Sequence, residues 1–206
     1  MQEPAVSDLR SLVSDIIVPF YQVRRATPLL FAEQRYENDA EHSWSLALFA
    51  CALAPHINPR LDTGKVAQYA TVHDLVEVHA GDTSNLAPES EKVGKEEREA
   101  VALRRLQSEL RAFPWIIDTL ESYEAQEDEE AVFVRAVDKI LPLLFDLIDE
   151  GWLYKEQKIT RDAWLEAMRR HREKASRHEG VFKYYEEIRV QLLANPDFFY
   201  QETTEA

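Results

Sequence analysis

Residues 71–83 read Thr-Val-His-Asp-Leu-Val-Glu-Val-His-Ala-Gly-Asp-Thr. The adjacent pair His73-Asp74 places an imidazole beside a carboxylate, and both groups are common ligands of divalent metals. Glu77 follows about one helical turn after His73, so the two side chains share a face if this stretch is helical. Gly81 is a residue type that often ends a helix. The stretch therefore predicts a helix that carries part of a metal site.

The rest of the chain has the pattern of a helical protein. It contains only five glycines in 206 residues, and its hydrophobic fraction of 45% is typical of a globular domain. Apolar residues at helical spacing predict helices near residues 7–24, 39–53, 63–79, 95–112, 115–123, 129–149, 160–176 and 180–194. Residues 25–38 are expected to be irregular. We therefore predict an all-α fold and one domain over residues 1–206, with residues 160–194 as its C-terminal helices.

Charge and composition exclude several functions. A net charge of −14 makes the chain a poor candidate for gripping a nucleic-acid duplex by its phosphates. A small anionic substrate is still compatible, because a bound cation can reverse the local field. Cys51 is the only cysteine, so no internal disulfide can form, and this suits a reducing, cytoplasmic location. We expect no signal peptide and no membrane span, because neither pattern occurs.

Asp138 lies in the middle of residues 129–149, the most apolar long segment of the chain. An unpaired ionised carboxylate in a core is costly, so a buried aspartate is usually ion-paired or bound to a metal. Asp138 is therefore a natural partner for His73-Asp74. The alternatives are an ion pair with an arginine such as Arg135 and an exposed position between apolar faces. For Asp138 taken alone, these alternatives are favoured.

His42 follows the sequence Glu-Asn-Asp-Ala-Glu near the start of the second predicted helix. Alone, such a histidine is more often a surface residue than a ligand. Together with His73, Asp74 and Asp138, it completes a set of two imidazoles and two carboxylates from three helices. That set suits one divalent ion of Mn, Co, Fe, Zn or Ni and leaves coordination positions for water and substrate.

The order His…His-Asp…Asp in helices resembles the HD-domain superfamily of metal-dependent phosphohydrolases. Three local sequences resemble its 5′-deoxynucleotidase branch more closely, and the similarity spans about residues 15–150. They are Ala-Glu-His-Ser-Trp at 40–44, His-Asp-Leu-Val-Glu at 73–77 followed by Gly-Asp-Thr at 81–83, and Ala-Val-Asp-Lys-Ile at 136–140. The resemblance implies a helical HD-domain bundle, commonly paired as a homodimer, that hydrolyses (deoxy)nucleoside 5′-monophosphates.

The resemblance also implies roles for individual residues. His42, His73, Asp74 and Asp138 would hold one divalent metal, and Glu77 would be the catalytic acid. Asp82 would contact the sugar of the substrate, and Arg25 its phosphate. These residues fit the chemistry, because a divalent cation activates water, a carboxyl group transfers protons and a guanidinium binds phosphate.

The chain departs from the family after Arg25, where members often have a tryptophan associated with rejecting ribonucleotides. Here Ala26-Thr27-Pro28 follows, and no tryptophan precedes Trp44. The sugar preference is therefore open, and two alternatives stand beside the nucleotidase: a hydrolase of another phosphoester, and a metal- or nucleotide-binding module without turnover.

Four further histidines lie outside the predicted ligand set, and one of them, His56, is expected to be structural, in a loop between Pro55 and Pro59. His79 is expected near the site or on the surface, with a second metal as the remaining alternative. His171 and His178 are expected on a solvated helix face, in or near a basic stretch.

Overall fold

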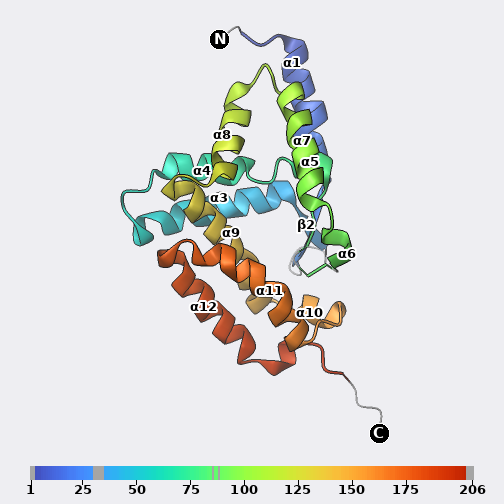
Figure 1. The fold of residues 1–206 in the computed structure, drawn as a ribbon, viewed down its shortest axis with the longest axis vertical. Helices are drawn as coiled ribbons and strands as arrows, with labels where there is room; N and C mark the ends of the chain where they lie inside the picture. The colour runs from blue at the N-terminus through green and yellow to red at the C-terminus, as the bar shows by residue number, and fades with distance from the viewer. Residues whose placement is uncertain (1–2, 30–34, 85, 88, 203–206) are drawn as a thin grey trace. The chain divides into compact units, whose positions relative to one another are not determined.

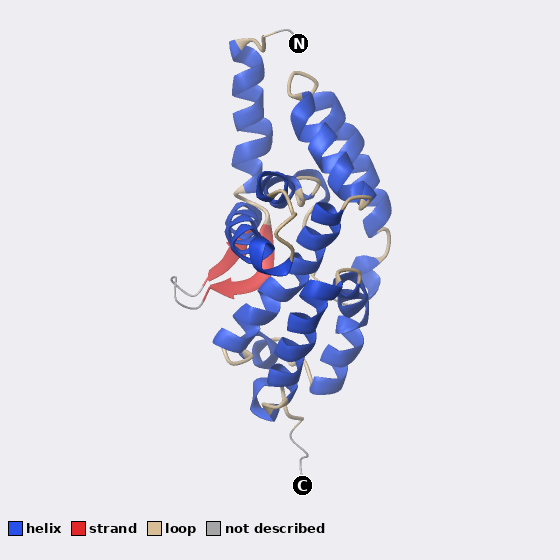
Figure 2. Ribbon diagram, turned by 90° about the vertical axis from the view of Figure 1, so that its left-hand side faces the viewer, coloured by secondary structure: helices blue, strands red, loops and turns tan. Residues whose placement is uncertain are grey.

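The computed structural model describes residues 3–29, 35–84, 86–87 and 89–202. Helices make up most of this part of the chain, as Figure 1 shows. The predicted all-α fold is confirmed, with one small two-stranded sheet in addition, drawn red in Figure 2. The chain divides into two compact units, one built from residues 1–26 and 36–131 and the other from residues 27–35 and 132–206. The expectation of a single domain over residues 1–206 stays a prediction.

The first unit begins with a continuous helical segment. Its parts are α1 (Val6–Ser11), the π-helical turn η1 (Leu12–Ile17) and α2 (Val18–Phe20). The unit continues with α3 (Asp39–Ile57), α4 (Thr63–Val72), α5 (Glu77–Ala80), α6 (Glu89–Lys92), α7 (Lys95–Glu109) and α8 (Pro114–Ala125). The N-terminal segment, α4, α7 and α8 share a core that contains Ile16, Val72, Leu106 and Leu120. This core holds the end of α4, where the His-Asp pair begins, in a fixed place.

The segment expected to be irregular contains two paired strands. They are β1 (Arg24–Leu29) and β2 (Arg35–Asn38). The expectation was wrong here because these residues do not alternate between apolar and polar types, so only the pairing itself defines the strands. Arg25 on β1 forms an ion pair with Glu37 on β2, with Nε 3.3 Å from Oε1. The hairpin thus brings a basic and an acidic side chain to the start of α3.

Helix α3 starts directly after β2. The Glu41 backbone N–H donates to Asn38 Oδ1 and the Asn38 backbone N–H donates to Glu41 Oε2, each at 3.0 Å, which is a capping box. The helix runs to Ile57, so the predicted end near residue 53 is wrong. Pro55 lies inside its last turn, where the loss of one backbone hydrogen bond is tolerated.

The predicted helix over residues 63–79 is interrupted. Helix α4 ends at Val72 and α5 begins at Glu77. Between them the backbone forms tight turns, in which Leu75 N–H donates to Val72 O at 3.0 Å and Glu77 N–H donates to Asp74 O at 2.9 Å. The His-Asp pair therefore lies on a turn that links two helices.

The second unit contains most of α9 (Glu129–Ile148), a helix that begins in the first unit. The later elements are α10 (Trp152–Glu156), α11 (Arg161–Ser176), α12 (Glu179–Leu193) and the 3₁₀ turn η2 (Pro196–Phe198). Tyr154 stacks on Phe199 with ring centroids 5.4 Å apart, and Trp164 meets Phe199 edge-on. Among the residues that the structure describes, we find no helix long and apolar enough to cross a membrane.

The expected solvated position is wrong for two histidines of this unit. His171 is 3% exposed and His178 is 9% exposed. His171 lies on the inner face of α11, with its Nδ1 3.2 Å from the Tyr185 hydroxyl of α12. Burial, together with the positive charges of Lys139 and Lys174, lowers the pKa of His171 to about 3. The neighbouring arginines and lysines hid the apolar face to which this residue belongs.

Candidate metal centre

His73 is fixed by the residues on either side of it. Its ring lies 3% exposed at the C-terminal end of α4, with Nδ1 2.9 Å from the Ala70 carbonyl oxygen. Its other nitrogen, Nε2, lies 2.8 Å from Asp74 Oδ2. A carbonyl can only accept a hydrogen bond, so Nδ1 is the donor, and Nε2 is the nitrogen that lies beside the carboxylate. Metal-bound histidines are typically held in this way, with the outer ring nitrogen donating to a carbonyl.

His42 comes from the first turn of α3 and is completely buried. Its ring centroid lies 5.3 Å from that of His73. Its Nδ1 is 3.3 Å from Glu37 Oε1, which gives this imidazole a carboxylate neighbour.

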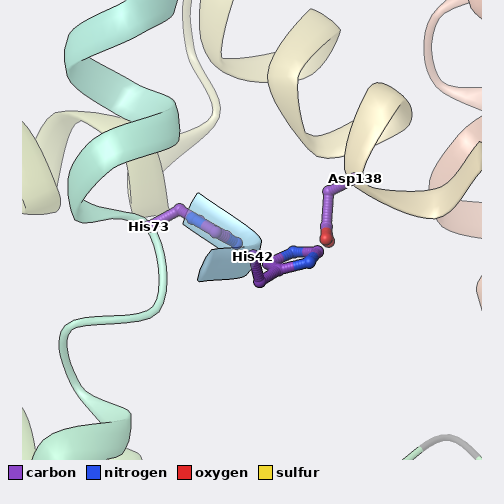
Figure 3. A group of neighbouring side chains, drawn as sticks. All are labelled: His42, His73 and Asp138. Atoms are coloured by element: carbon purple, nitrogen blue, oxygen red, sulfur yellow. The ribbon is translucent and has the colours of Figure 1, made fainter. Parts of the chain in front are cut away.

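Asp138 is the acid in the middle of α9, and it is 6% exposed. Its carboxylate has an ion pair with the adjacent Lys139. One potential ligand atom each from His42, His73 and Asp138 lies within 4.8 Å of the other two. Figure 3 shows these three side chains as neighbours. Two imidazoles and one carboxylate at this spacing are able to hold a divalent metal ion.

The donor set fits a metal by its chemistry as well as by its spacing. A neutral imidazole carries one proton, yet the two nitrogens of His73 lie 2.9 Å and 2.8 Å from oxygens that accept hydrogen bonds. Such a ring needs either a second proton or a cation beside Nε2. The His42 imidazole and the Asp138 carboxylate lie next to the His73 ring. One divalent cation would therefore be able to bind all three side chains together.

A second group of potential ligands consists of three acids and includes Asp74. One carboxylate oxygen each from Asp39, Asp74 and Glu77 lies within 4.8 Å of the others. Arg25 contacts this group, with Nη1 2.8 Å from Asp74 Oδ2, 3.2 Å from Asp39 Oδ1 and 4.0 Å from Glu77 Oε2. The predicted phosphate-binding arginine is thus engaged with acids of the centre.

The crowding of buried acids shifts their proton affinities. Burial raises the pKa of Glu77 above its usual range, and the negative charges of Asp74 and Asp82 raise it further. Burial and the charge of Asp74 also raise the pKa of Asp39 to about 7, with Arg25 acting in the opposite direction. The pKa of Asp82 is raised mainly by burial. This surplus of negative charge favours the binding of cations.

The structure therefore places the predicted residues in two adjoining groups. His42, His73 and Asp138 form the first group, and Asp74 and Glu77 belong to the second. Asp74 touches the first group through His73.

His79 lies apart from both groups of potential ligands that the described residues contain. Its Nε2 is 2.7 Å from Glu109 Oε2 on α7. This contact links α5 to α7 and gives His79 a partner outside the metal centre.

Sequence reasoning assigned no role to Glu37 and Asp39, although both lie within five residues of His42. They are 1% and 0% exposed, and both contact Arg25. The available signal was a pair of acids at alternate positions just before a helix that carries a candidate ligand. That signal had no meaning without the hairpin that returns Arg25 to the same place.

Comparison with known proteins agrees with this geometry. Residues 21–179 match the family model of the HD domain. The chain is similar to the crystal structure of a predicted metal-dependent phosphohydrolase from Magnetospirillum magnetotacticum MS-1, at 28% identity and a TM-score of 0.74. That match covers 95% of this chain and 100% of the other. No curated protein matches the chain.

Two archaeal structures show the same fold at lower identity. A conserved hypothetical protein from Pyrococcus furiosus is 20% identical, with a TM-score of 0.58 over 92% of this chain and 99% of the other. A protein from Pyrococcus horikoshii OT3 is 24% identical, with a TM-score of 0.56 over 94% of this chain and 99% of the other. Since the HD-domain model matches well over half of the sequence, the predicted superfamily is confirmed, and this chain belongs to the HD-domain family.

Proposed function

We propose that this protein is a metal-dependent phosphomonoesterase that converts (deoxy)nucleoside 5′-monophosphates and water into nucleosides and phosphate. The observation that carries the proposal is the group of His42, His73 and Asp138, with Asp74 against His73 and Glu77 beside Asp74. The similarity to a predicted metal-dependent phosphohydrolase supports the reaction class. The resemblance of residues 40–44, 73–83 and 136–140 to 5′-deoxynucleotidases supports a nucleotide as the substrate.

His42, His73, Asp74 and Asp138 are the proposed metal ligands. A divalent cation held there supplies positive charge that polarises a phosphoryl oxygen and makes water a better nucleophile. The metal identity is open, because two imidazoles and two carboxylates accept Mn, Co, Fe, Zn or Ni.

The remaining residues have proposed roles around the phosphate ester. The P–O5′ bond breaks as a water oxygen bonds to phosphorus, so one proton leaves the water and one is needed on O5′. The Glu77 carboxyl lies beside Asp74 and is proposed to transfer these protons. The Arg25 guanidinium is proposed to bind the phosphate, and the Asp82 carboxylate a sugar hydroxyl.

A phosphate-release assay tests the proposal. Metal-free protein is supplied with Mn²⁺, Co²⁺, Fe²⁺, Zn²⁺ or Ni²⁺ and with dAMP, dGMP or dUMP, each beside its ribonucleotide. We expect release with at least one metal and a loss of at least a hundredfold in Asp74→Ala. Asp118→Ala is the matched control, because it removes an exposed acid on α8. Full activity after chelation, or in Asp74→Ala, contradicts the proposal.

A second candidate keeps the metal centre and changes the substrate. Ala26 follows Arg25 where family members often have a tryptophan, so the substrate side of the site differs from the resemblance. The candidate is a hydrolase of another phosphoester. A panel of sugar phosphates, nucleotides and aryl phosphates, compared by kcat/KM, separates the two candidates by which class ranks first.

We propose a cytoplasmic location for the enzyme, consistent with its single cysteine. Assembly as a homodimer, which the family resemblance implies, is proposed with it. Sedimentation of the purified protein tests the assembly, and a monomer at all concentrations contradicts it.

A further inference from the structure

Asp39 is a fully buried acid at the first residue of α3. Its backbone N–H donates to the Val23 carbonyl oxygen at 3.2 Å. Its side-chain Oδ1 accepts a hydrogen bond from Arg25 Nη1 at 3.2 Å. Asp39 therefore holds residues 23–25 to the start of the helix that carries His42.

Arg25 also contacts Asp74, so it connects Asp39 to the His73-Asp74 turn. The same guanidinium nitrogen, Nη1, donates to Asp74 Oδ2 at 2.8 Å. A charge-assisted hydrogen bond of this length fixes the direction of a carboxylate. Since Asp74 Oδ2 also faces His73 Nε2 at 2.8 Å, the orientation set by Arg25 is the orientation presented to the metal centre.

A second cation is the other explanation for the acids around Arg25. Asp39, Asp74 and Glu77 are close enough to share one. However, Arg25 Nη1 already lies within 4.0 Å of an oxygen of each of these acids. The guanidinium supplies the positive charge there, so the acids are better explained as its anchors.

We propose that Asp39 is a positioning residue that orients Asp74 for metal binding through Arg25. The inference rests on the proposed metal centre and adds to it a connection between α3 and the His73-Asp74 turn. Asp39 lies three residues before His42, so one helical turn carries both an imidazole of the centre and the anchor of Arg25. Mutation of a residue that hydrogen-bonds to a metal ligand commonly lowers the metal affinity about tenfold to a hundredfold.

A double-mutant cycle on metal binding tests the proposal. Mn²⁺ is titrated into the metal-free full-length protein, its Asp39→Asn and Arg25→Gln variants, and the double variant. We expect each single change to weaken Mn²⁺ binding about tenfold to a hundredfold. The double variant should bind no more weakly than the weaker single variant, because both changes break one connection.

A role limited to charge gives a different result in the same cycle. Asp39→Asn removes a negative charge and would weaken Mn²⁺ binding, whereas Arg25→Gln removes a positive charge and would strengthen it. Tighter binding by Arg25→Gln, or effects of the two changes that simply add, overturns the proposal.

Co²⁺ supplies a spectroscopic readout that a loss of stability does not produce. The visible absorption of bound Co²⁺ reports the arrangement of its ligands, and we expect it to change in Asp39→Asn. Asp146→Asn is the matched control, since Asp146 is also buried but is hydrogen-bonded to Tyr154 in the second unit. We expect the control to keep the wild-type Co²⁺ spectrum and Mn²⁺ affinity.

The outcomes separate this inference from the proposed function. If Asp39→Asn does not fold, Asp39→Ser carries the same test with a smaller side chain. Wild-type Mn²⁺ affinity and Co²⁺ spectrum in a folded Asp39 variant overturn the positioning role and leave the metal centre standing. If the wild-type protein binds neither metal, the metal centre fails and the positioning role fails with it.

Discussion

The surroundings of Glu77 suit a role in proton transfer better than a role as a metal ligand. It is 5% exposed, belongs with Asp39 and Asp74, and lies outside the group of His42, His73 and Asp138. Its raised pKa has burial as the first cause, which favours the protonated carboxyl. A protonated acid beside a metal centre is suited to supplying a proton to a leaving oxygen.

Glu77→Gln keeps the size of this side chain and removes proton transfer. We expect kcat for phosphate release to fall by a factor of about 10² to 10⁴, the usual contribution of a general acid or base. We expect the Mn²⁺ dissociation constant to stay within a few-fold of the wild-type value. A variant that retains more than a tenth of the wild-type kcat contradicts the assignment.

The residue types and the family resemblance together were sufficient to nominate the candidate ligands, but not the residues that hold them in place. His42, His73, Asp74 and Asp138 could be proposed because imidazoles and an acid in an apolar helix are informative without coordinates. Glu37 acts on Arg25, twelve residues away in the sequence, and Arg25 in turn reaches Asp74. Such a chain of contacts depends on the fold, so local patterns do not reveal it.

The elements were predictable where their periodicity is regular, and less so near the metal centre. Helices α11 and α12 agree with the predicted ranges to within one residue at each end. The break between α4 and α5 was missed, because residues 73–76 keep a helical pattern while forming tight turns. Trp44, one of the apolar residues whose spacing predicts the helix over residues 39–53, is 68% exposed. Tertiary contacts determine these features, and periodicity does not report them.

At the scale of elements, we predict that Gly151, which directly precedes α10, is required for stability. It has a left-handed φ of +66°, and an added Cβ would lie 2.3 Å from the Phe198 backbone oxygen. We expect Gly151→Ala to lower the free energy of unfolding by about 3 kcal/mol or more, because strain and overlap combine. Gly94→Ala is the control, with φ +73° but only an Arg98 side-chain atom at 3.8 Å.

Urea unfolding of both glycine variants is the measurement. The control should lose only about 1–2 kcal/mol from its left-handed backbone. Equal losses in the two variants would show that the close approach to Phe198 is not what requires glycine at position 151.

At the scale of the whole molecule, the family model spans residues of both compact units. The helical class followed from composition and spacing, since few glycines and regular apolar positions are local properties. The division into two units did not follow, because it depends on contacts between distant segments. The net charge of −14 also belongs to this scale, so attraction for the proposed anionic substrate would have to come from a bound metal and from local basic groups.

The pH dependence of stability gives a prediction for the folded chain. Burial raises the pKa of Asp146 from 3.8 to about 7. The folded state therefore holds this proton more tightly, so its contribution to stability is full below about pH 4 and is lost as the pH rises through 7. Asp146→Asn removes the titrating group. We expect the stability of this variant relative to the wild type to increase between pH 4 and pH 7.

Urea unfolding at a series of pH values measures this difference. One proton changes the free energy of unfolding by at most about 1.4 kcal/mol per pH unit. A difference between Asp146→Asn and the wild type that stays constant from pH 4 to pH 7 contradicts the raised pKa.

The most direct test of the metal centre is a crystal structure of the Mn²⁺-loaded protein with anomalous diffraction at the manganese edge. We predict a strong anomalous peak for a manganese ion coordinated by His42, His73, Asp74 and Asp138. We predict that this peak is absent in crystals of Asp74→Ala. A peak located away from these four residues, or none in Mn²⁺-loaded wild-type crystals, would contradict the account.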